Sequence, residues 1–349
     1  MKKIKNLQKS LIIALLLMVL GTVAGCGQQE AKVDANPPAK TETAQTEDKE
    51  IRVVTTYKPA TEIVLALGAK DKLVGANGKS KKDPMITALD PALAERLLEV
   101  GSKSGMNVEQ IIALKPDVVV TNERKAGADT IAKLKEQNIN VITIEPESLD
   151  LLQSDIKKVG EAIGESENAD KLIAYYDSKL AYMAEKLKAV ENKKTVYLAG
   201  GHGFLSTCSG DFYQHEIIEL AGGKDVGAEL KGGWNDVSVE QVLAWNPDVI
   251  ASVMYCDGGK PSEIMAREDI QTLGAVKNKA VYQIPSNLAA WDMPQPSSIL
   301  AIMWLGQKLY PEVFADLDMQ AEANEYYTTF YGKSFDDLGG NFGESSAAN

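Results

Sequence analysis

The sequence predicts an α/β fold of two related lobes, each with a mainly parallel sheet, joined by one long rigid helix. Three observations support this fold. Short β-rich runs alternate with amphipathic helical runs, as in parallel sheets covered by helices. An uninterrupted helical pattern separates two such alternating regions, and one block of sequence occurs once in each of them.

The first lobe is expected over residues 51–164. Runs of β-branched residues predict its strands, and apolar residues three and four positions apart predict its helices. The expected strands are Val53–Thr55, Val118–Val120 and Val141–Ile144, and the expected helices are Ala60–Leu67, Val108–Leu114 and Thr130–Glu136.

The joining helix is expected over residues 165–192. Neither Gly nor Pro interrupts this segment, and acidic residues at its start suit the helix dipole. A helix of this size is about 35–40 Å long at 1.5 Å per residue, which is enough to cross both lobes. Its apolar face comprises Ala169, Leu172, Ile173, Tyr176, Leu180, Met183 and Leu187.

The second lobe is expected over residues 193–333, and residues 334–349 are expected to form a tail. The same patterns predict strands and helices here. The strands are Thr195–Leu198, Val249–Val253 and Val281–Ile284, and the helices are Val239–Trp245 and Ser298–Leu309.

The repeated block begins at Asn107 and again at Ser238, 131 residues later. Val, Glu, Gln, Ala, Pro, Asp and Val recur in register within it. Asn and Ser are good helix N-caps, and the Pro ends the helix before an apolar strand. A chance match of this density is improbable, so the two lobes are expected to be related.

The N-terminus is typical of an exported protein. Residues 1–25 read as a signal peptide, with four lysines followed by an apolar run from Leu11 to Leu20. The alternative interpretation is an uncleaved membrane-spanning helix. The apolar run is shorter than the roughly 20 residues that such a helix needs. The segment ends in Val-Ala-Gly-Cys26, which resembles a lipobox and predicts that Cys26 is lipidated. Residues 26–50 are expected to hold this cysteine and a flexible tether.

Composition excludes some functions. The chain has 349 residues and a net charge of −12, with no basic stripe, so nucleic acid is a poor candidate partner. The sequence lacks a G-x-S-x-G elbow, a phosphate loop ending in Lys-Ser/Thr and an H-E-x-x-H helix, so an enzyme is not expected. Cys208 and Cys256 could pair in an oxidising compartment, or remain free thiols.

Both copies of the repeat resemble the Fe/cobalamin-type periplasmic binding proteins, whose two lobes are joined by one rigid helix. The resemblance covers about Ile51 to Gly332. It is most specific in the two repeats and in the segments Glu219–Val226, Trp291–Ser297 and Met303–Glu312.

The resemblance implies an extracytoplasmic binding lipoprotein, held at the membrane by its anchor and monomeric. It would deliver a small molecule to a dimeric ABC permease with a cytoplasmic ATPase. The expected ligand is a metal chelate: a ferric siderophore, haem or a corrinoid. An oxyanion such as molybdate or a bare metal ion is the alternative, although two histidines in one lobe are few for a bare-ion site. A surface sensor or a lipid-anchored hydrolase is the alternative of another class. No cofactor is expected.

Candidate ligand-binding residues lie in loops that follow strands, where two-lobed binders hold their ligands. The first lobe offers Tyr57, Lys58 and Arg124, with Asn122 and Lys125 beside them. Tyr57 is its only aromatic residue up to Asp150, whereas all four tryptophans lie in the second lobe. One basic wall and one aromatic wall are therefore expected. The second lobe's candidates are His202, Phe204, Tyr213, Trp234, Tyr255 and Trp291, with Phe212 beside Tyr213.

Glu109 and Glu240 are candidate permease-docking residues. Each is the third residue of its repeat, which places it in the first turn of a short helix where the dipole tolerates a negative charge. The family resemblance implies docking for both positions. Helix capping alone is the other interpretation.

Overall fold

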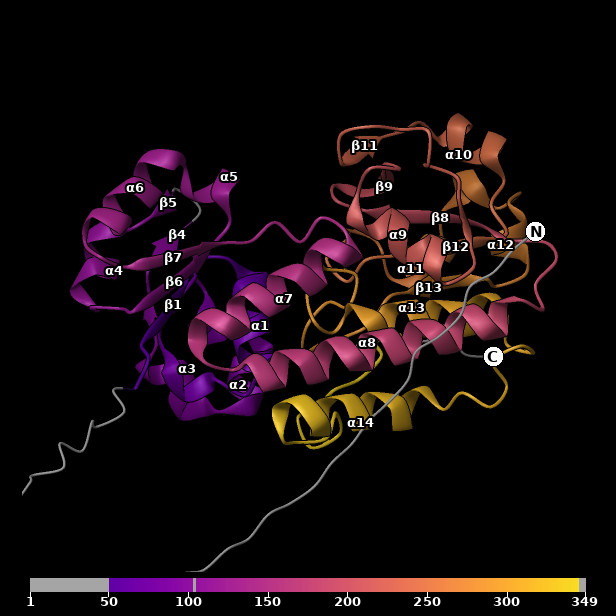
Figure 1. Cartoon of the computed structure of the whole chain (residues 1–349). Coiled ribbons are helices and arrows are strands. Elements are labelled where there is room, and N and C mark those ends of the chain that lie inside the picture. Colours follow the sequence, from indigo (N-terminus) through magenta and orange to yellow (C-terminus); the bar gives the residue numbers. More distant parts are fainter. Residues whose placement is uncertain (1–49, 103–104, 345–349) are drawn as a thin grey trace, which may run out of the picture. The chain divides into compact units, whose positions relative to one another are not determined.

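Five parallel strands form the first sheet, in the order β3-β2-β1-β6-β7, in the computed structural model (Figure 1). The structure describes residues 50–102 and 105–344. All residues of β1 and β6 are buried, and valine runs suit such central strands because branched side chains pack well on a covered sheet. The strands are β1 (Val53–Thr55), β2 (Leu73–Ala76), β3 (Leu98–Glu99), β6 (Val118–Thr121) and β7 (Asn140–Thr143).

Helices cover both faces of this sheet. Val53 and Val120 belong to the core that includes α1 and α7, whereas Val54 and Val119 belong to the core under α4 and α6, as side-chain alternation along strands requires. A hairpin of β4 (Gly101–Ser102) and β5 (Gly105–Met106) precedes α4. The helices are α1 (Lys58–Ala66), α2 (Pro84–Leu89), α3 (Pro91–Arg96), α4 (Val108–Ala113), α5 (Glu123–Ala126), α6 (Ala128–Glu136) and α7 (Leu149–Ile163).

The second sheet has the order β11-β9-β8-β12-β13, with β10 also paired to β8. The pairs β8–β10, β8–β12 and β12–β13 are parallel, whereas β9 is antiparallel to both β8 and β11. The predicted fold class, two α/β lobes with mainly parallel sheets, is confirmed. The strands are β8 (Thr195–Gly200), β9 (Gly203–Cys208), β10 (Lys224–Asp225), β11 (Trp234–Asp236), β12 (Val249–Ser252) and β13 (Val281–Gln283).

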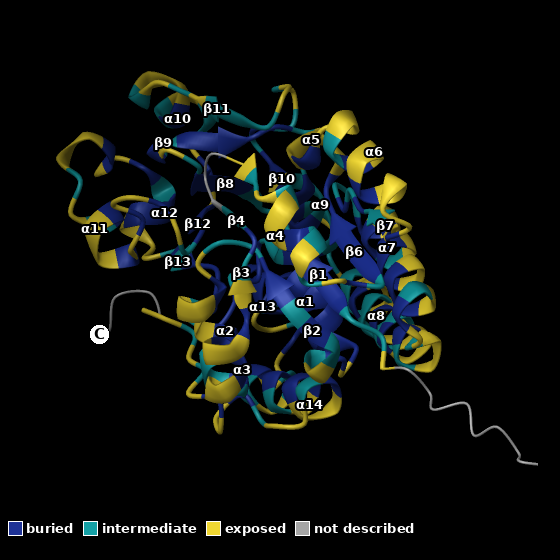
Figure 2. Ribbon diagram, turned by 90° about the vertical axis from the view of Figure 1, so that its left-hand side faces the viewer, coloured by how far each residue is buried: buried dark blue, intermediate teal, exposed yellow. Residues whose placement is uncertain are grey.

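The second lobe contains the helices α9 to α14. Figure 2 shows the strands of both lobes mostly in dark blue, with exposed yellow residues on outer helices such as α5 and α6. The helices are α9 (Tyr213–Leu220), α10 (Val239–Trp245), α11 (Pro261–Met265), α12 (Gly274–Lys277), α13 (Ser298–Leu309) and α14 (Met319–Tyr331).

The joining helix is α8 (Ser166–Leu187), 22 residues long. Near its start, Asn168 Nδ2 donates to the Leu67 carbonyl of the first lobe at 3.1 Å. Further along, the Tyr176 hydroxyl donates to the Pro296 carbonyl of the second lobe at 2.7 Å. The helix ends five residues before Asn192, the predicted end. The helix α8 therefore contacts both lobes.

The C-terminal segment is packed rather than a free tail, which corrects the prediction for residues 334–343. Phe335 is fully buried, and its ring centre lies 5.7 Å from that of Trp291. Phe342 also packs on Trp291. Lys333 Nζ donates to the Leu89 carbonyl of the first lobe at 2.9 Å. The buried ring of Phe335 and the partly buried ring of Phe342 account for the packing, because they remove apolar area from water.

The Pro-Asp pair of the repeat has the same structural role in both lobes. Asp117 Oδ2 accepts a hydrogen bond of 2.9 Å from the backbone N–H of Arg52, just before β1. Asp248 Oδ2 accepts one of 2.8 Å from the N–H of Thr195, the first residue of β8. Each aspartate therefore ties its own strand to the start of the neighbouring strand. This shared contact explains why the residue recurs in register.

The two cysteines in the described residues are free and buried. Burial raises the pKa of the Cys208 thiol, and raises that of Cys256 to about 11, so both remain protonated at neutral pH. The sequence left open whether Cys208 and Cys256 form a disulfide or remain free thiols, and in the structure they are free thiols. The predicted signal peptide, Cys26 and the expected tether up to residue 49 lie outside the described residues. Within residues 50–102 and 105–344, none of the helices combines the length and apolar character needed to cross a membrane.

Glu62 is a buried carboxyl group in α1, only 2% exposed. Burial, with the nearby Asp83 charge, raises its pKa to about 8, and Lys58 opposes that shift. In the unfolded chain a glutamate titrates near 4.3, so between these pH values the folded state binds more protons than the unfolded state. The protonated Glu62 carboxyl group therefore contributes stability to the folded state at low pH. This contribution is lost as the pH rises to about 8.

Glu62→Gln is expected to flatten the loss of stability between about pH 4.5 and 8 and to raise the free energy of unfolding at pH 8, on the order of a few kcal/mol. Chemical denaturation at several pH values, with wild type as the control, measures this. Parallel curves for the two proteins would contradict the assignment of this pH dependence to Glu62.

Candidate functional site

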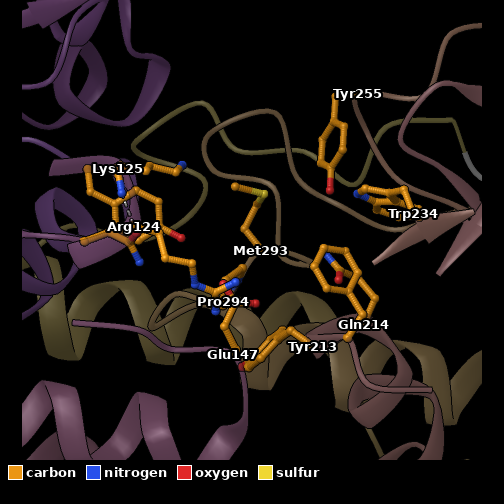
Figure 3. A pocket seen from close by; sticks show the side chains of 12 residues that line it. Arg124, Lys125, Glu147, Tyr213, Gln214, Trp234, Tyr255, Met293 and Pro294 are labelled. Atoms are coloured by element: carbon orange, nitrogen blue, oxygen red, sulfur yellow. Dashed lines mark hydrogen bonds between the residues drawn. The ribbon is translucent and has the colours of Figure 1, made fainter. Parts of the chain in front are cut away.

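A cavity of about 480 Å³ lies between the two lobes, with lining residues from both (Figure 3). The first lobe contributes Tyr57, Asn122, Arg124, Lys125 and Glu147. The second lobe contributes Phe212, Tyr213, Gln214, Trp234, Tyr255, Met293 and Pro294.

The first-lobe residues follow the carboxyl ends of neighbouring strands. Tyr57 comes two residues after β1, Asn122 directly after β6, and Glu147 shortly after β7. Because these strands are parallel neighbours, their carboxyl ends meet at one edge of the sheet. Asn122 fixes the local backbone: its Oδ1 accepts from the N–H of Lys125 at 3.2 Å, and its Nδ2 donates to the Ile144 carbonyl at 3.1 Å.

This wall carries charges of both signs. Arg124 forms an ion pair with Glu145, and the Arg124 side chain is 71% exposed. Lys125 Nζ lies 4.2 Å from the ring centre of Tyr57, and burial lowers the pKa of this lysine. Burial also raises the pKa of the Tyr57 hydroxyl, which therefore stays protonated. The wall offers cations and a hydroxyl, with carboxylates already beside them.

The second-lobe wall is aromatic. The rings of Phe212 and Trp234 meet edge to face, with centres 5.5 Å apart. The Trp234 indole lies against the turn between β8 and β9, where a Cβ on Gly200 would come within 2.4 Å of the indole. Glycine is required there because the ring and the backbone approach so closely. The Tyr213 hydroxyl lies 2.6 Å from Ser298 Oγ, which fixes this ring as well.

A buried carboxylate lies behind the aromatic wall. The Tyr255 hydroxyl donates to Asp292 Oδ2 at 2.8 Å, and Gln214 Nε2 donates to the same oxygen at 3.4 Å. Asp292 is fully buried, and burial raises its pKa to about 6. It remains ionised at neutral pH and orients both side chains.

The cavity contains five of the nine predicted ligand-binding residues: Tyr57, Arg124, Tyr213, Trp234 and Tyr255. Asn122, Lys125 and Phe212, noted beside them, line it too. Glu147, Gln214, Met293 and Pro294 were not predicted. Glu147 could have been found, because it follows a predicted strand as Arg124 does.

Trp291 and Phe204 are core residues, which corrects their prediction as cavity residues. Trp291 is fully buried, and its indole N–H donates to the Tyr327 hydroxyl at 3.2 Å. Phe204 is 4% exposed, and its ring packs on Tyr197 and under the Arg267 guanidinium. Phe204 lies in β9 and Trp291 lies in a loop, and the packing turns both rings inward.

Lys58 and His202 do not line the cavity either, and each has a carboxylate partner. Lys58 Nζ lies 2.6 Å from Asp83 Oδ2. His202, in the turn between β8 and β9, has its Nδ1 3.1 Å from Asp236 Oδ1. These two contacts with carboxylates account for both residues. In the part of the chain that the structure describes, no group of three or more His, Cys, Asp or Glu side chains could hold a metal ion.

Glu109 and Glu240 are exposed in the first turns of α4 and α10, outside the cavity. The capping hydrogen bonds of these helices come from their neighbours. Asn107 Oδ1 accepts from the N–H of Gln110 at 3.1 Å, and Ser238 Oγ accepts from that of Gln241 at 3.2 Å. Hydrogen bonds from its own backbone and from Ser238 lower the pKa of Glu240. Neither glutamate side chain is needed for the cap itself.

Known proteins are similar to this chain in fold and in sequence. A model of the periplasmic binding protein family matches residues 53–288. The uncharacterised ABC transporter substrate-binding lipoprotein YvrC of Bacillus subtilis is 29% identical over 325 residues, which cover 87% of this chain and 98% of YvrC. The vitamin B12-binding protein of Yersinia pestis is 29% identical over 199 residues, 57% of this chain and 68% of that protein.

The molybdate-binding protein MolA of Haemophilus influenzae is 28% identical over 308 residues, 81% of this chain and 87% of MolA. The structure of MolA bound to molybdate matches with a TM-score of 0.70 and 27% identity, covering 81% of this chain and 93% of that one. These matches confirm the resemblance to the Fe/cobalamin-type binding proteins. The chain belongs to the periplasmic binding protein family and is the substrate-binding protein of an ABC transporter.

Proposed function

We propose that this protein captures a metal chelate with acidic groups, such as a ferric siderophore, haem or a corrinoid, and delivers it to the permease of an ABC importer. One observation carries the proposal: a wall that presents the cations of Arg124 and Lys125 from one lobe faces an aromatic wall from the other across one cavity (Figure 3). Aromatic faces bind flat or apolar surfaces, and Arg and Lys bind carboxylates.

The size of the cavity supports an organic ligand. About 480 Å³ falls within the range of small-molecule sites, roughly 300–1,000 Å³. A bare tetrahedral oxyanion would fill only a small part of this volume and would leave Phe212, Trp234 and Tyr255 without contact. A chelate can occupy both walls at once.

The two walls are expected to contribute unequally to affinity. Arg124 already has a carboxylate partner in Glu145, so a ligand acid there replaces one ion pair with another. Such exposed pairs contribute little, about 0–1 kcal/mol. The aromatic wall has no such competing partner. The affinity should therefore depend mainly on aromatic contact, and Arg124 should orient the ligand.

An oxyanion such as molybdate is the second candidate, because MolA is similar over most of both chains. Arg124 and Lys125 could hold such an anion. A thermal-shift screen of the soluble chain, from residue 27 onwards, distinguishes the candidates with haem, cyanocobalamin, ferrioxamine B and molybdate as probes. A probe at 100 times its dissociation constant adds roughly 2.7 kcal/mol of stability.

Trp234→Ala is expected to weaken binding of the best chelate about 10- to 100-fold, because it removes a large ring from the aromatic wall. Arg124→Ala should weaken binding about 3- to 10-fold. Calorimetric titration measures both. Trp245→Phe is the matched control, since Trp245 packs on Tyr197 outside the cavity. Stabilisation by molybdate alone, with Trp234→Ala unaffected, would favour the oxyanion and contradict the chelate.

We also propose that Cys26 anchors the protein to the outer face of the cell membrane by lipid. The name of YvrC, a lipoprotein with matching length, supports this. We further propose that the chain acts as a monomer and that Glu109 and Glu240 dock it on the permease. Their exposed and equivalent places in α4 and α10 support the docking role.

A further inference from the structure

The group of polar atoms behind the aromatic wall has more acceptors than donors. Asp292 Oδ1 and Gln214 Oε1 are buried, and neither has a hydrogen-bond partner among the residues that the structure describes. The Tyr255 hydroxyl and the Gln214 amide both donate to Asp292 Oδ2, and the Gln214 side chain also forms a hydrogen bond with the Tyr255 hydroxyl. Buried acceptors without a donor are costly, so native proteins usually provide one.

Asp292 determines which role its neighbours can take. A tyrosine hydroxyl has a single proton, and that of Tyr255 is given to Asp292 at 2.8 Å. The Tyr255 oxygen can therefore only accept a hydrogen bond from another molecule. The amide nitrogen of Gln214 likewise faces Asp292, which leaves its oxygen as the free acceptor.

Tyr255 makes this group reachable from the cavity. Its side chain is 42% exposed, and both Tyr255 and Gln214 line the cavity. Figure 3 shows them beside Trp234, on the side opposite Arg124 and Lys125. The two ends of the cavity thus differ: one has cationic donors, and the other has acceptors.

We propose that Tyr255, Gln214 and Asp292 form a subsite for hydrogen-bond donors, in which Asp292 is a positioning residue and the ligand presents N–H or O–H groups to Tyr255. This inference rests on the proposed function and narrows its ligand class. The ligand presents anionic or carbonyl oxygens to Arg124 and Lys125 at one end, and amide, hydroxyl or ammonium groups to Tyr255 at the other. Chelates with carboxylates alone do not satisfy the subsite.

The experiment uses the four probes named above, in two classes. Cyanocobalamin and ferrioxamine B carry N–H donors, whereas haem and molybdate have none at pH 7.5. The expected result is that a donor-bearing probe binds the wild-type protein most tightly. Tightest binding of haem or of molybdate would overturn the inference. The haem result would leave the proposed chelate function intact. If none of the probes binds, the proposed function and this inference both fail.

Asp292→Asn then tests the positioning role with the donor-bearing probe that binds best. The asparagine amide can donate to Tyr255 or Gln214, which releases their own donors and reverses the polarity of the subsite. A loss of about tenfold in affinity is expected. Tyr255→Phe should cost a similar factor, and the double variant no more than the larger single loss, because both changes act through one hydroxyl.

Thermal unfolding without ligand shows whether each variant is folded, and the Trp245→Phe protein gives the baseline. A purely structural role for Asp292 would lower unfolding temperature without this non-additive loss of affinity. Unchanged affinity in folded Asp292→Asn, or fully additive losses in the double variant, would overturn the positioning role.

Discussion

A protein with lysine in place of both Glu109 and Glu240 is expected to bind its ligand normally and to lose transport almost completely, about 100-fold or more. The two acids lie at equivalent places, one in each lobe, at the start of α4 and of α10. A permease surface that binds them must offer positive charge. Lysine there brings like charges together at a contact, which costs several kcal/mol.

The variant should fold and bind because lysine at these places removes only the local hydrogen bonds that Glu240 accepts from Ser238 and from its own backbone. Both side chains are exposed, and Asn107 and Ser238 already make the capping hydrogen bonds. The remaining effect is that of a positive charge near a helix N-terminus, about 0.3–1 kcal/mol per site. Ligand affinity should not change, since neither residue lines the cavity.

Ligand uptake by vesicles that contain the permease and its ATPase measures transport, with calorimetry on the same protein samples for affinity. The matched control replaces Glu136 and Glu268 with lysine. These two residues are also exposed, one in each lobe, so the change in net charge is identical. The control should transport normally. Full uptake by the Glu109→Lys/Glu240→Lys protein would contradict the docking role and would support a role at the helix N-termini alone.

The sequence predicts most of the fold because its strongest signals are local. The valine run at Val118–Val120 and the helix pattern before it depend on neighbouring residues, and the repeat shows the same pattern twice. The antiparallel strands β9 and β11 were missed because pairing across a sheet is set by distant residues. The packing of Phe335 on Trp291 was missed for the same reason.

The candidate site was predicted better in one wall than in the other. Tyr57 and Arg124 follow strand ends, and parallel sheet geometry alone brings such positions together. The aromatic wall depends on which way each ring points in a loop. Trp291 turns into the core while its neighbour Asp292 contacts Tyr255, and no sequence pattern distinguishes these orientations. Of the six residues predicted for the aromatic wall, Tyr213, Trp234 and Tyr255 line the cavity, whereas His202, Phe204 and Trp291 do not.

The lipid anchor also gives a large expected effect. Four lysines, an apolar run and small residues precede Cys26, and this order is typical of lipoprotein signals. In a lipoprotein the cysteine sulfur is bonded to the lipid through a thioether. A serine hydroxyl cannot form this bond. Stable membrane attachment takes two lipid signals, because a single acyl chain binds only marginally.

Cys26→Ser is therefore expected to lose the lipid label entirely and either to leave the membrane fraction or to accumulate as the unprocessed precursor. Labelling cells with a radioactive fatty acid, followed by fractionation and mass measurement, reads all three results. Cys256→Ser is the matched control: it makes the same chemical change at a buried free thiol, so it should keep both label and membrane attachment. A normal label on the Cys26→Ser protein would show that another residue is modified. Membrane retention of Cys26→Ser, with no label on the wild type, would show that the apolar segment itself is the anchor.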